Sequence, residues 1–245
     1  MHFTRIENLP NILKFGLIPK DTLDEKEYPI EYRLTDDNRL DRNKDGNCLS
    51  ITHPNEKMLQ SKIEKSGYKF AFLIFDINKV LFGDYWSLPP KFYYTNSASK
   101  EIRDNIRIDE LGGSYSSVEA FRFMFKDEFI VSLSYGTRPE RRKGDTPPNR
   151  TTDVQAEVVI RAIIPPDYIK KIIFYECAKN DVNDFCEQLA EKEIWSIKSK
   201  VYLCEDQNSE IDINAKLEKI KKKIEADKMK SSDPVSALNN HFKDR

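Results

Sequence analysis

The sequence Phe-Ala-Phe-Leu-Ile-Phe at residues 70–75 contains no polar side chain. A strand that faces water on one side alternates apolar and polar residues, so a strand that is apolar at every position is buried on both faces. These six residues therefore predict a strand in the middle of a sheet. Shorter apolar stretches on either side predict further strands. They lie at residues 2–4, 48–52, 92–94, 156–164, 169–175 and 201–203.

Helices are predicted between these strands. Residues 8–10 are Asn-Leu-Pro, so Asn8 is expected to cap a helix, Pro10 suits its first turn, and Gly16 ends it. Amphipathic patterns predict further helices at residues 54–65, 117–126, 181–193 and 213–229. The polar stretches 19–47 and 136–150 are predicted to be long loops, and long loops inside compact domains tend to be functional.

Composition limits the class of protein. The chain has 245 residues with 14 Phe, 11 Tyr and 2 Trp, too many aromatic side chains for a disordered chain. No apolar run approaches the roughly 18 residues that a membrane span needs, so no membrane partner is expected. The first residues lack a signal-peptide pattern, which predicts a cytoplasmic protein. We expect one α+β domain at residues 1–205 and a lysine-rich helix and tail at residues 206–245.

Metal binding is not expected from the sequence. The four cysteines, Cys48, Cys177, Cys186 and Cys204, are far apart and form no Cys-x-x-Cys pair. This spacing fits neither a zinc site nor a dense disulfide framework, so we expect four reduced thiols. Only three histidines are present, which argues against a histidine-rich metal centre.

Glu157 is the first candidate for chemistry. It lies at the start of an apolar strand, between Ala156 and the sequence Val-Val-Ile. A carboxylate in such a position is costly unless it is paired or used in a reaction. Strand alternation leaves a second interpretation open, in which Glu157 faces water at the edge of a strand.

Basic side chains gather in the predicted loop 136–150, directly before Glu157. The net charge of the whole chain is only −1, so any affinity for nucleic acid must come from a local surplus such as this one. The positive residues of the loop are Arg138, Arg141, Arg142, Lys143 and Arg150, against Glu140 and Asp145. They suit the phosphates of a polyanionic substrate, or they only make the loop a solvated surface segment. The lysine-rich helix at residues 213–229 reads as an ordinary solvated face.

Four separated pieces of the sequence resemble the DarT family of nucleic-acid ADP-ribosyltransferase toxins. The first is His-Phe-Thr at residues 2–4 with the helix that follows, up to Leu17. The others are residues 35–41 with 48–58, residues 92–99, and residues 151–160 with 164–169. They occur in the order of the family and together span residues 2–175.

The resemblance implies an ADP-ribosyltransferase-like fold, with a split mixed β-sheet core and peripheral helices. It implies NAD as the donor substrate, with no metal. Glu157 and Arg39 would be catalytic, Glu157 by stabilising the positive charge that develops on the ribose. The residues that would bind NAD are His2, Phe3, Thr4, Arg39, Asn55 and Asn96. Tyr93 and Tyr94 would stack on nicotinamide or pack in the core.

The acceptor implied by the resemblance is a base in single-stranded nucleic acid. DNA is favoured, with guanine or thymine modified, and modification of mRNA in phage defence is the alternative. Single strands suit such an enzyme because their bases are already unpaired, and Tyr135 would offer a stacking platform. Phosphates would contact Arg138, Arg141, Arg142 and Arg150. The protein would be the toxin of a toxin–antitoxin or phage-defence system, with an antitoxin protein as its partner.

Two other classes of function are considered. A metal-dependent nuclease of the restriction type needs a lysine two residues after its strand glutamate, and Val159 stands there instead. A non-catalytic toxin–antitoxin interaction protein would use the lysine-rich helix and tail to hold its partner. Replacing Glu157 separates this last class from a transferase.

Overall fold

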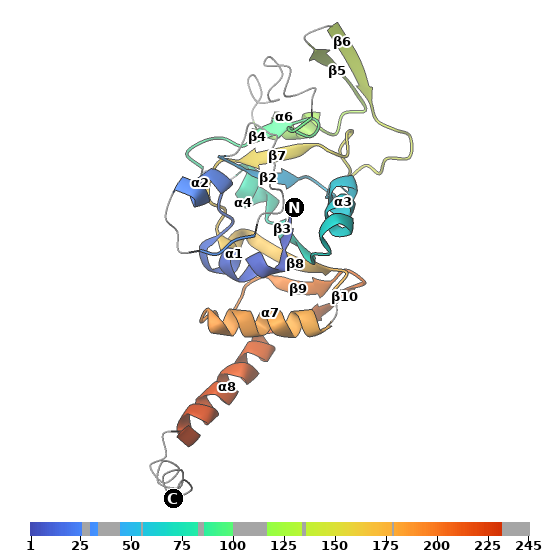
Figure 1. The fold of residues 1–245 in the computed structure, drawn as a ribbon. Coiled ribbons are helices and arrows are strands. Elements are labelled where there is room, and N and C mark those ends of the chain that lie inside the picture. The colour runs from blue at the N-terminus through green and yellow to red at the C-terminus, as the bar shows by residue number, and fades with distance from the viewer. Residues whose placement is uncertain are drawn as a thin grey trace, which may run out of the picture.

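The structure is a computed structural model that describes residues 1–25, 30–33, 45–54, 56–82, 86–99, 117–133, 136–177 and 179–231 (Figure 1). Three sheets and a set of short helices form the body, which confirms the α+β class. The β5–β6 hairpin extends from one end and helix α8 from the other (Figure 1).

The larger sheet has five strands in the order β1-β3-β8-β9-β10. Strand β3 pairs antiparallel with β1 and β8, while β8 and β9 are parallel. Residues 70–73 of β3 are buried, so the prediction of a buried inner strand is confirmed. The strands are β1 His2–Arg5, β3 Phe70–Phe75, β8 Ile169–Tyr175, β9 Lys200–Leu203 and β10 Asp206–Ile211.

The second sheet has three antiparallel strands in the order β2-β7-β4. These are β2 Asn47–Ser50, β7 Glu157–Ile160 and β4 Lys91–Tyr93. Strand β7 is therefore central, and Glu157 pairs in register with Ser50 on one side and Tyr93 on the other. Glu157 is thus the end residue of a strand that has a neighbouring strand on each side.

The core lies between these two sheets. One continuous apolar cluster contains Leu73 and Ile172 of the larger sheet and Leu49, Phe92 and Val158 of the smaller sheet. Burial of apolar surface on this scale is the main driving force that holds two sheets together. The core is thus shared by a mixed five-stranded sheet and an antiparallel three-stranded sheet.

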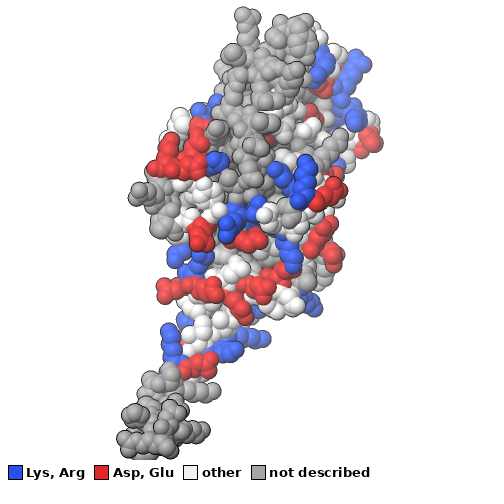
Figure 2. All heavy atoms as spheres, in the orientation of Figure 1, with Lys and Arg blue, Asp and Glu red and all other residues white. Residues whose placement is uncertain are grey.

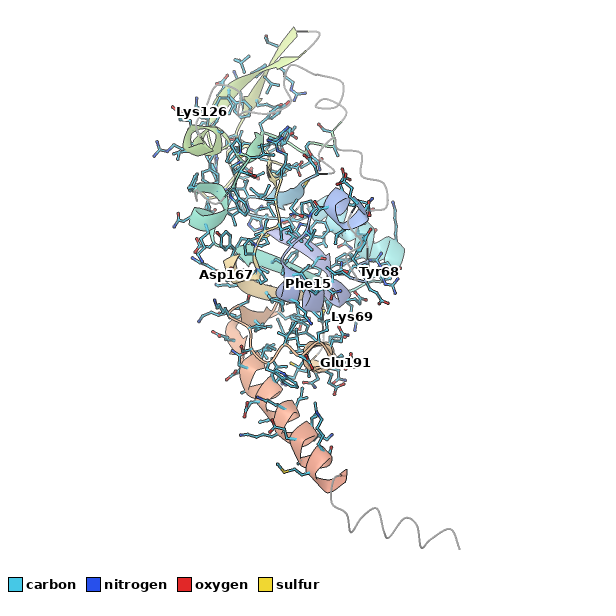
Figure 3. All side chains as sticks on the ribbon, turned by 90° about the vertical axis from the view of Figure 1, so that its left-hand side faces the viewer. Phe15, Tyr68, Lys69, Lys126, Asp167 and Glu191 are labelled. Atoms are coloured by element: carbon cyan, nitrogen blue, oxygen red, sulfur yellow. The ribbon has the colours of Figure 1, made fainter. Side chains whose placement is uncertain are left out.

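Helices pack against the sheets. The predicted helix α7 buries Val182, Phe185, Cys186 and Leu189, and the ring of Phe185 lies 5.3 Å from that of Phe174 on β8. Figure 3 shows that Lys126, after α6, and Glu191, at the end of α7, lie at opposite ends of the body. The helices are α1 Leu9–Phe15, α2 Lys20–Glu25, α3 Glu56–Ser66, α4 Ile77–Phe82, α6 Ser117–Phe123, α7 Lys179–Glu191 and α8 Ile213–Ser231, with 3₁₀ turns η1 Ile6–Asn8 and η3 Pro166–Tyr168.

Gly16 ends helix α1 as predicted. Its φ of +91° and ψ of 172° lie in a region that only glycine adopts at low cost. A Cβ atom at this position would lie 2.6 Å from the backbone oxygen of Ile164. The next residue, Leu17, pairs with Ile164 in an isolated bridge, so the chain passes very close to the segment after β7.

The two predicted loops contain regular structure. Helix α2 lies in the stretch 19–47, and the stretch 136–150 begins with strand β6, Gly136–Arg141. Strand β6 pairs antiparallel with β5, Glu128–Leu133, which the sequence did not predict. The polar and basic residues of β6 hid its strand character, because the burial that normally reveals a strand is missing here: only Glu140 of β6 is even half-buried.

The C-terminal part packs on the body at its start and is exposed further along the chain. Strand β10 extends the larger sheet past residue 205, where the lysine-rich unit was expected to begin. Helix α8 starts at Ile213 as predicted, and Leu217 is fully buried. Residues 222–229 are all exposed, and Figure 1 shows that end of the helix leaving the body. The division at residue 205 stays a prediction. No helix in the described part of the chain is long and apolar enough to cross a membrane.

Candidate active site

One pocket joins the two larger sheets. Its walls come from β1, α1 and α2, from segment 30–33, from β2 and β7, and from the turn after β4. Among the predicted site residues, those that line it are His2, Phe3, Thr4, Asn96 and Glu157. Residues from positions 2 to 157 of the chain are thus brought to one cavity.

Glu157 points into this pocket from the first position of the central strand β7. Its Oε1 accepts a hydrogen bond from the backbone N–H of Ser97, with an N–O distance of 2.6 Å. The side chain is half-buried, so the carboxylate is held by the protein while it still faces the cavity. The opening histidine lines the same pocket, as the catalytic assignment requires.

His2 connects the two sheets. Its Nδ1 lies 3.0 Å from the backbone oxygen of Cys48 on β2. A carbonyl oxygen only accepts hydrogen bonds, so Nδ1 donates here, and in the neutral form of the ring Nε2 is then an acceptor. The α-amino group of Met1 donates to the backbone oxygen of Ser50 at 2.6 Å, and burial lowers the pKa of this amine to about 5. These two bonds fix the start of β1 against the strand beside Glu157.

Phe3 and Thr4 are buried in the wall of the pocket and expose little polar surface to it. The ring of Phe3 is buried edge-on against Phe70, with ring centroids 6.0 Å apart. Thr4 is 3% exposed, and its Oγ1 accepts a hydrogen bond from Asn8 at 3.1 Å. One lone pair of the Thr4 hydroxyl is therefore used inside the protein.

Asn8 does not cap helix α1 through its side chain, which corrects the expectation from sequence. Its amide instead pairs with the backbone of Arg33. Nδ2 donates to the Arg33 oxygen and the Arg33 N–H donates to Oδ1, each at 2.8 Å. Asn11, three residues later, donates to the oxygen of Glu31 at 2.6 Å. The two amides hold segment 30–33, here called the strap, against the pocket.

A second set of contacts anchors the strap to α2. The hydroxyl of Tyr32 donates to Oδ1 of Asp24 at 2.5 Å, and Lys20 pairs with Oδ2 at 2.8 Å. The hydrogen bond to Asp24 is the main cause of the raised pKa of Tyr32, so the phenol stays protonated. Lys20, Tyr32 and Arg33 all line the pocket. The strap was not predicted from the sequence, although amides at positions 8 and 11 are spaced to lie on one face of a helix and could have indicated it.

Asn96 begins the turn that contacts Glu157. Its Oδ1 accepts from the N–H of Ala98 at 2.7 Å, and its backbone oxygen accepts from Ser99 at 2.9 Å. Tyr93 and Tyr94, just before the turn, are each 3% exposed and pack with Phe129 and Val159. Of the two interpretations offered for these tyrosines, packing in the core is the one the structure supports.

Three predicted site residues cannot be compared with the geometry. Arg39, Asn55 and Tyr135 lie outside the described residues. Their expected roles stay predictions. Among the described residues, no group of three or more His, Cys, Asp or Glu side chains is arranged to hold a metal ion.

The predicted phosphate-binding arginines lie away from the pocket, on β6 and the loop after it. None of the four is among the described residues that line the cavity. Arg138 pairs with Glu140, and Arg141 lies 3.2 Å from Glu128 on β5. Figure 2 shows Lys and Arg gathered over the hairpin, with acidic residues beside them.

Arg142 and Arg150 shape the loop that follows. The guanidinium of Arg142 donates to the backbone oxygens of Phe125 and Pro147 and, at 2.8 Å, of Arg150. It therefore organises residues 143–150, a role that the sequence did not predict. Burial, and then the charge of Arg150, lower the pKa of His53, which lies three residues after β2.

An acidic side chain at the start of a central strand and a histidine from the opening strand face one pocket between split sheets. This arrangement and the α+β fold agree with the class of protein that the resemblance in the sequence predicts, an ADP-ribosyltransferase. A family model described as "DarT: ssDNA thymidine ADP-ribosyltransferase, DarT" matches residues 1–203. The chain therefore belongs to the DarT family, and the resemblance found in the sequence is confirmed.

Solved structures of this family are similar to the chain. Thermus sp. 2.9 DarT in complex with NAD+ is 16% identical with a TM-score of 0.48. The same protein in complex with carba-NAD+ is 15% identical with a TM-score of 0.47. Each match covers 84% of this chain and 94% of that one.

A third similar structure comes from another organism. Thermosipho africanus DarTG in complex with ADP-ribose is 13% identical with a TM-score of 0.41, and the match covers 82% of this chain and 48% of that one. No curated protein matches the sequence. The family assignment rests on the family model.

Proposed function

We propose that this protein transfers ADP-ribose from NAD to a base in single-stranded DNA. The observation that carries the proposal is the single pocket shared by His2 and Glu157, with the Glu157 carboxylate fixed by the Ser97 N–H. Thymine is the favoured base, because the matching family model is described as a thymidine ADP-ribosyltransferase.

The proposed reaction follows from the chemistry of a glycosidic bond. The bond between nicotinamide and ribose C1′ breaks, its electron pair leaves with nicotinamide, and positive charge develops on the ribose. The carboxylate of Glu157 stabilises that charge and accepts a proton from the attacking base as the new bond to C1′ forms. One carboxylate thus acts on both the donor and the acceptor.

The donor side of the proposal uses the opposite wall. The acceptor nitrogen Nε2 of His2 suits a ribose hydroxyl. The pyrophosphate needs positive charge or N–H donors, and the described Lys and Arg residues of the lining are Lys20 and Arg33. We propose Arg33 as a pyrophosphate contact in addition to the predicted contact of Arg39, because a guanidinium presents paired donors to phosphate. Asn55 stays a proposed contact of the same ligand.

The acceptor side extends along the β5–β6 hairpin. The side chains of Arg138 and Arg141 are 45% and 72% exposed. Each guanidinium carries five N–H donors, which suit phosphate oxygens. We propose that these two arginines and Arg150 contact the backbone of the strand, while Arg142 organises the loop. Unpaired bases are the accessible targets.

The direct test combines labelled NAD with single-stranded DNA and RNA oligonucleotides that each contain one modifiable base. Mass analysis of the digested nucleosides is expected to find ADP-ribose on thymidine, and none with Glu157→Gln. ADP-ribose on guanine alone, or on RNA alone, would replace the acceptor and keep the reaction. Activity that needs Mg²⁺ and not NAD would reject the transferase and support a nuclease.

We further propose that the protein acts as the toxin of a toxin–antitoxin pair in the cytoplasm. Expression in bacterial cells is expected to stop growth, and Glu157→Ala is expected to restore it. A non-catalytic interaction protein would remain toxic with that substitution. Pull-down of tagged Glu157→Ala with the product of a neighbouring gene is the measurement for the antitoxin partner.

A further inference from the structure

The turn at Asn96–Ser99 lies where β4 stops pairing with β7. Tyr93 is the last residue of β4 and pairs in register with Glu157. Beyond it the chain turns, and the backbone of Ser97 meets the Glu157 side chain instead of its backbone. The change in chain direction after Tyr93 therefore replaces strand pairing with β7 by a hydrogen bond to the Glu157 carboxylate.

The contact is made by the main chain and not by the serine hydroxyl. Ser97 is 2% exposed, and its Oγ is buried without a hydrogen-bond partner among the described residues. The N–H at 2.6 Å from Oε1 is a charge-assisted hydrogen bond, which is shorter and stronger than a neutral one. Any residue with a backbone N–H could donate in this way, so the position of the peptide group matters more than the identity of residue 97.

Asn96 sets the position of that peptide group. Its side-chain Oδ1 accepts from the N–H of Ala98, and its backbone oxygen accepts from Ser99. An asparagine oxygen bonded to the backbone two residues later replaces one side of a turn with a side chain. These two bonds flank Ser97 and hold its N–H toward β7. The Oδ1 atom is thereby used inside the protein.

We infer that Asn96 is a positioning residue for the transfer reaction: it builds the turn from which the Ser97 N–H fixes Oε1 of Glu157. This role replaces the direct NAD contact expected from the sequence, and it rests on the proposed function. A carboxylate fixed at one oxygen presents a defined plane to the ribose. If the turn relaxes, that plane rotates and the chemical step slows while NAD still binds.

Three substitutions separate positioning from ligand binding. Asn96→Ala removes the acceptor oxygen, and Asn96→Asp keeps an oxygen at the same place. Asp76→Ala is the control, because Asp76 Oδ1 likewise accepts from the N–H two residues later, that of Asn78 at 3.0 Å, but at the start of helix α4 and outside the pocket lining. Thermal unfolding of each variant reports whether the fold is kept.

Kinetics give the first readout. Misplacement of a reacting group by about 1 Å costs roughly 100-fold in rate, so Asn96→Ala is expected to lower kcat by about 10- to 100-fold. Its KM for NAD stays within about twofold, Asn96→Asp regains most of the kcat, and Asp76→Ala keeps the kcat of the wild type. An unchanged kcat in Asn96→Ala overturns the inference, as does a raised KM for NAD with equal loss in Asn96→Asp, the signature of a ligand contact through Nδ2.

The second readout does not depend on activity. The amide proton of Ser97, observed by NMR, is expected to shift and to exchange faster in both Glu157→Gln and Asn96→Ala. A Ser97 signal unchanged in Asn96→Ala overturns the inference whether or not the protein modifies DNA. Wild-type protein without NAD-dependent transfer would instead reject the proposed function, so the two failures are distinguished.

Discussion

The pocket wall and the β5–β6 hairpin are both rich in polar side chains but use them differently. In the wall, the Asn8 side chain joins β1 to the strap, and His2 joins β1 to β2, 46 residues away in the chain. In the hairpin, Arg138 pairs with a residue two positions away and Arg141 with one thirteen positions away. The wall therefore depends on the whole fold, while the hairpin is organised by local pairs.

This difference predicts how each region responds when one hydrogen-bond or ion-pair partner is removed. A polar group buried in the wall costs free energy if its partner is removed, because water does not replace the missing bond. An exposed ion pair in the hairpin loses little, because water solvates both charges. The expected effects of substitutions therefore decrease from the pocket to the hairpin.

The largest effect is expected from Glu157→Gln. The amide keeps the size of the side chain but removes the charge that faces the ribose, so kcat should fall by about 100- to 1000-fold or more. The melting temperature should stay close to that of the wild type. Steady-state kinetics with NAD and a thymidine-containing oligonucleotide measure the loss. A kcat within a few-fold of wild type would remove Glu157 from the mechanism.

Gly16→Ala tests how closely the wall must pack. The positive φ is strained for alanine, and the new Cβ would meet the Ile164 oxygen at 2.6 Å. Strain of this kind costs roughly 2–3 kcal/mol in free energy of unfolding, before any relaxation of the neighbouring chain. Urea denaturation gives the value. Gly144→Ala is the control, because nothing lies within 4 Å of its Cβ position. Equal stability of the two variants would contradict the close approach.

Asn8→Ala tests the strap. This substitution removes the hydrogen bonds of the Asn8 amide to the N–H and oxygen of Arg33 and to the hydroxyl of Thr4. The free energy of unfolding should fall by about 1–3 kcal/mol, and the KM for NAD should rise. Asn11→Ala, with one exposed bond to the strap, is expected to do less in both measurements. If both variants bind NAD like the wild type in calorimetry, the strap does not form the donor site.

Arg142→Ala is expected to have a smaller effect on stability, confined to the loop 143–150. Loss of three bonds to carbonyl oxygens should increase hydrogen exchange and proteolysis there. Arg141→Ala removes only an exposed pair with Glu128 and should leave both unchanged. The comparison of hairpin and wall would be wrong if Arg141→Ala opened the loop equally.

The smallest effect, on binding alone, is expected from reversal of Arg138 and Arg141 to Glu. Affinity for single-stranded DNA should fall, and the slope of log affinity against log salt should flatten by about one for each phosphate that the protein no longer neutralises. Fluorescence anisotropy with a labelled oligonucleotide across a salt series measures both. Affinity and slope that do not respond would place the nucleic acid elsewhere on the surface.

Several elements could be predicted because their signals are local. The apolar run at residues 70–75, the end of α1 at Gly16 and the amphipathic pattern of α7 each depend on residues close together in the chain. Strand β6 was missed for the opposite reason. Its residues are mostly exposed and include Pro139, so burial left no pattern in the sequence, and only the register with β5 defines it.

The candidate site was predicted in part. His2, Phe3, Thr4 and Asn96 were named from the family resemblance, Glu157 also from its place in an apolar strand, and all five line the pocket. What they do there depends on their neighbours. An asparagine in front of a helix suits a cap in sequence, but the Asn8 side chain bonds the backbone of Arg33 because the strap passes within reach.

The sequence by itself determined the class of the protein, its apolar strands and the acidic residue at the start of one of them. Hydrophobic periodicity and local backbone preferences involve only a few neighbouring residues, so short stretches of sequence are enough to reveal them. Only the tertiary structure decided that Ser97 holds Glu157 and that Arg142 supports a loop. Those bonds join segments that only the packing of the whole chain brings together. The identity of a polar residue does not indicate which distant residue it will bond.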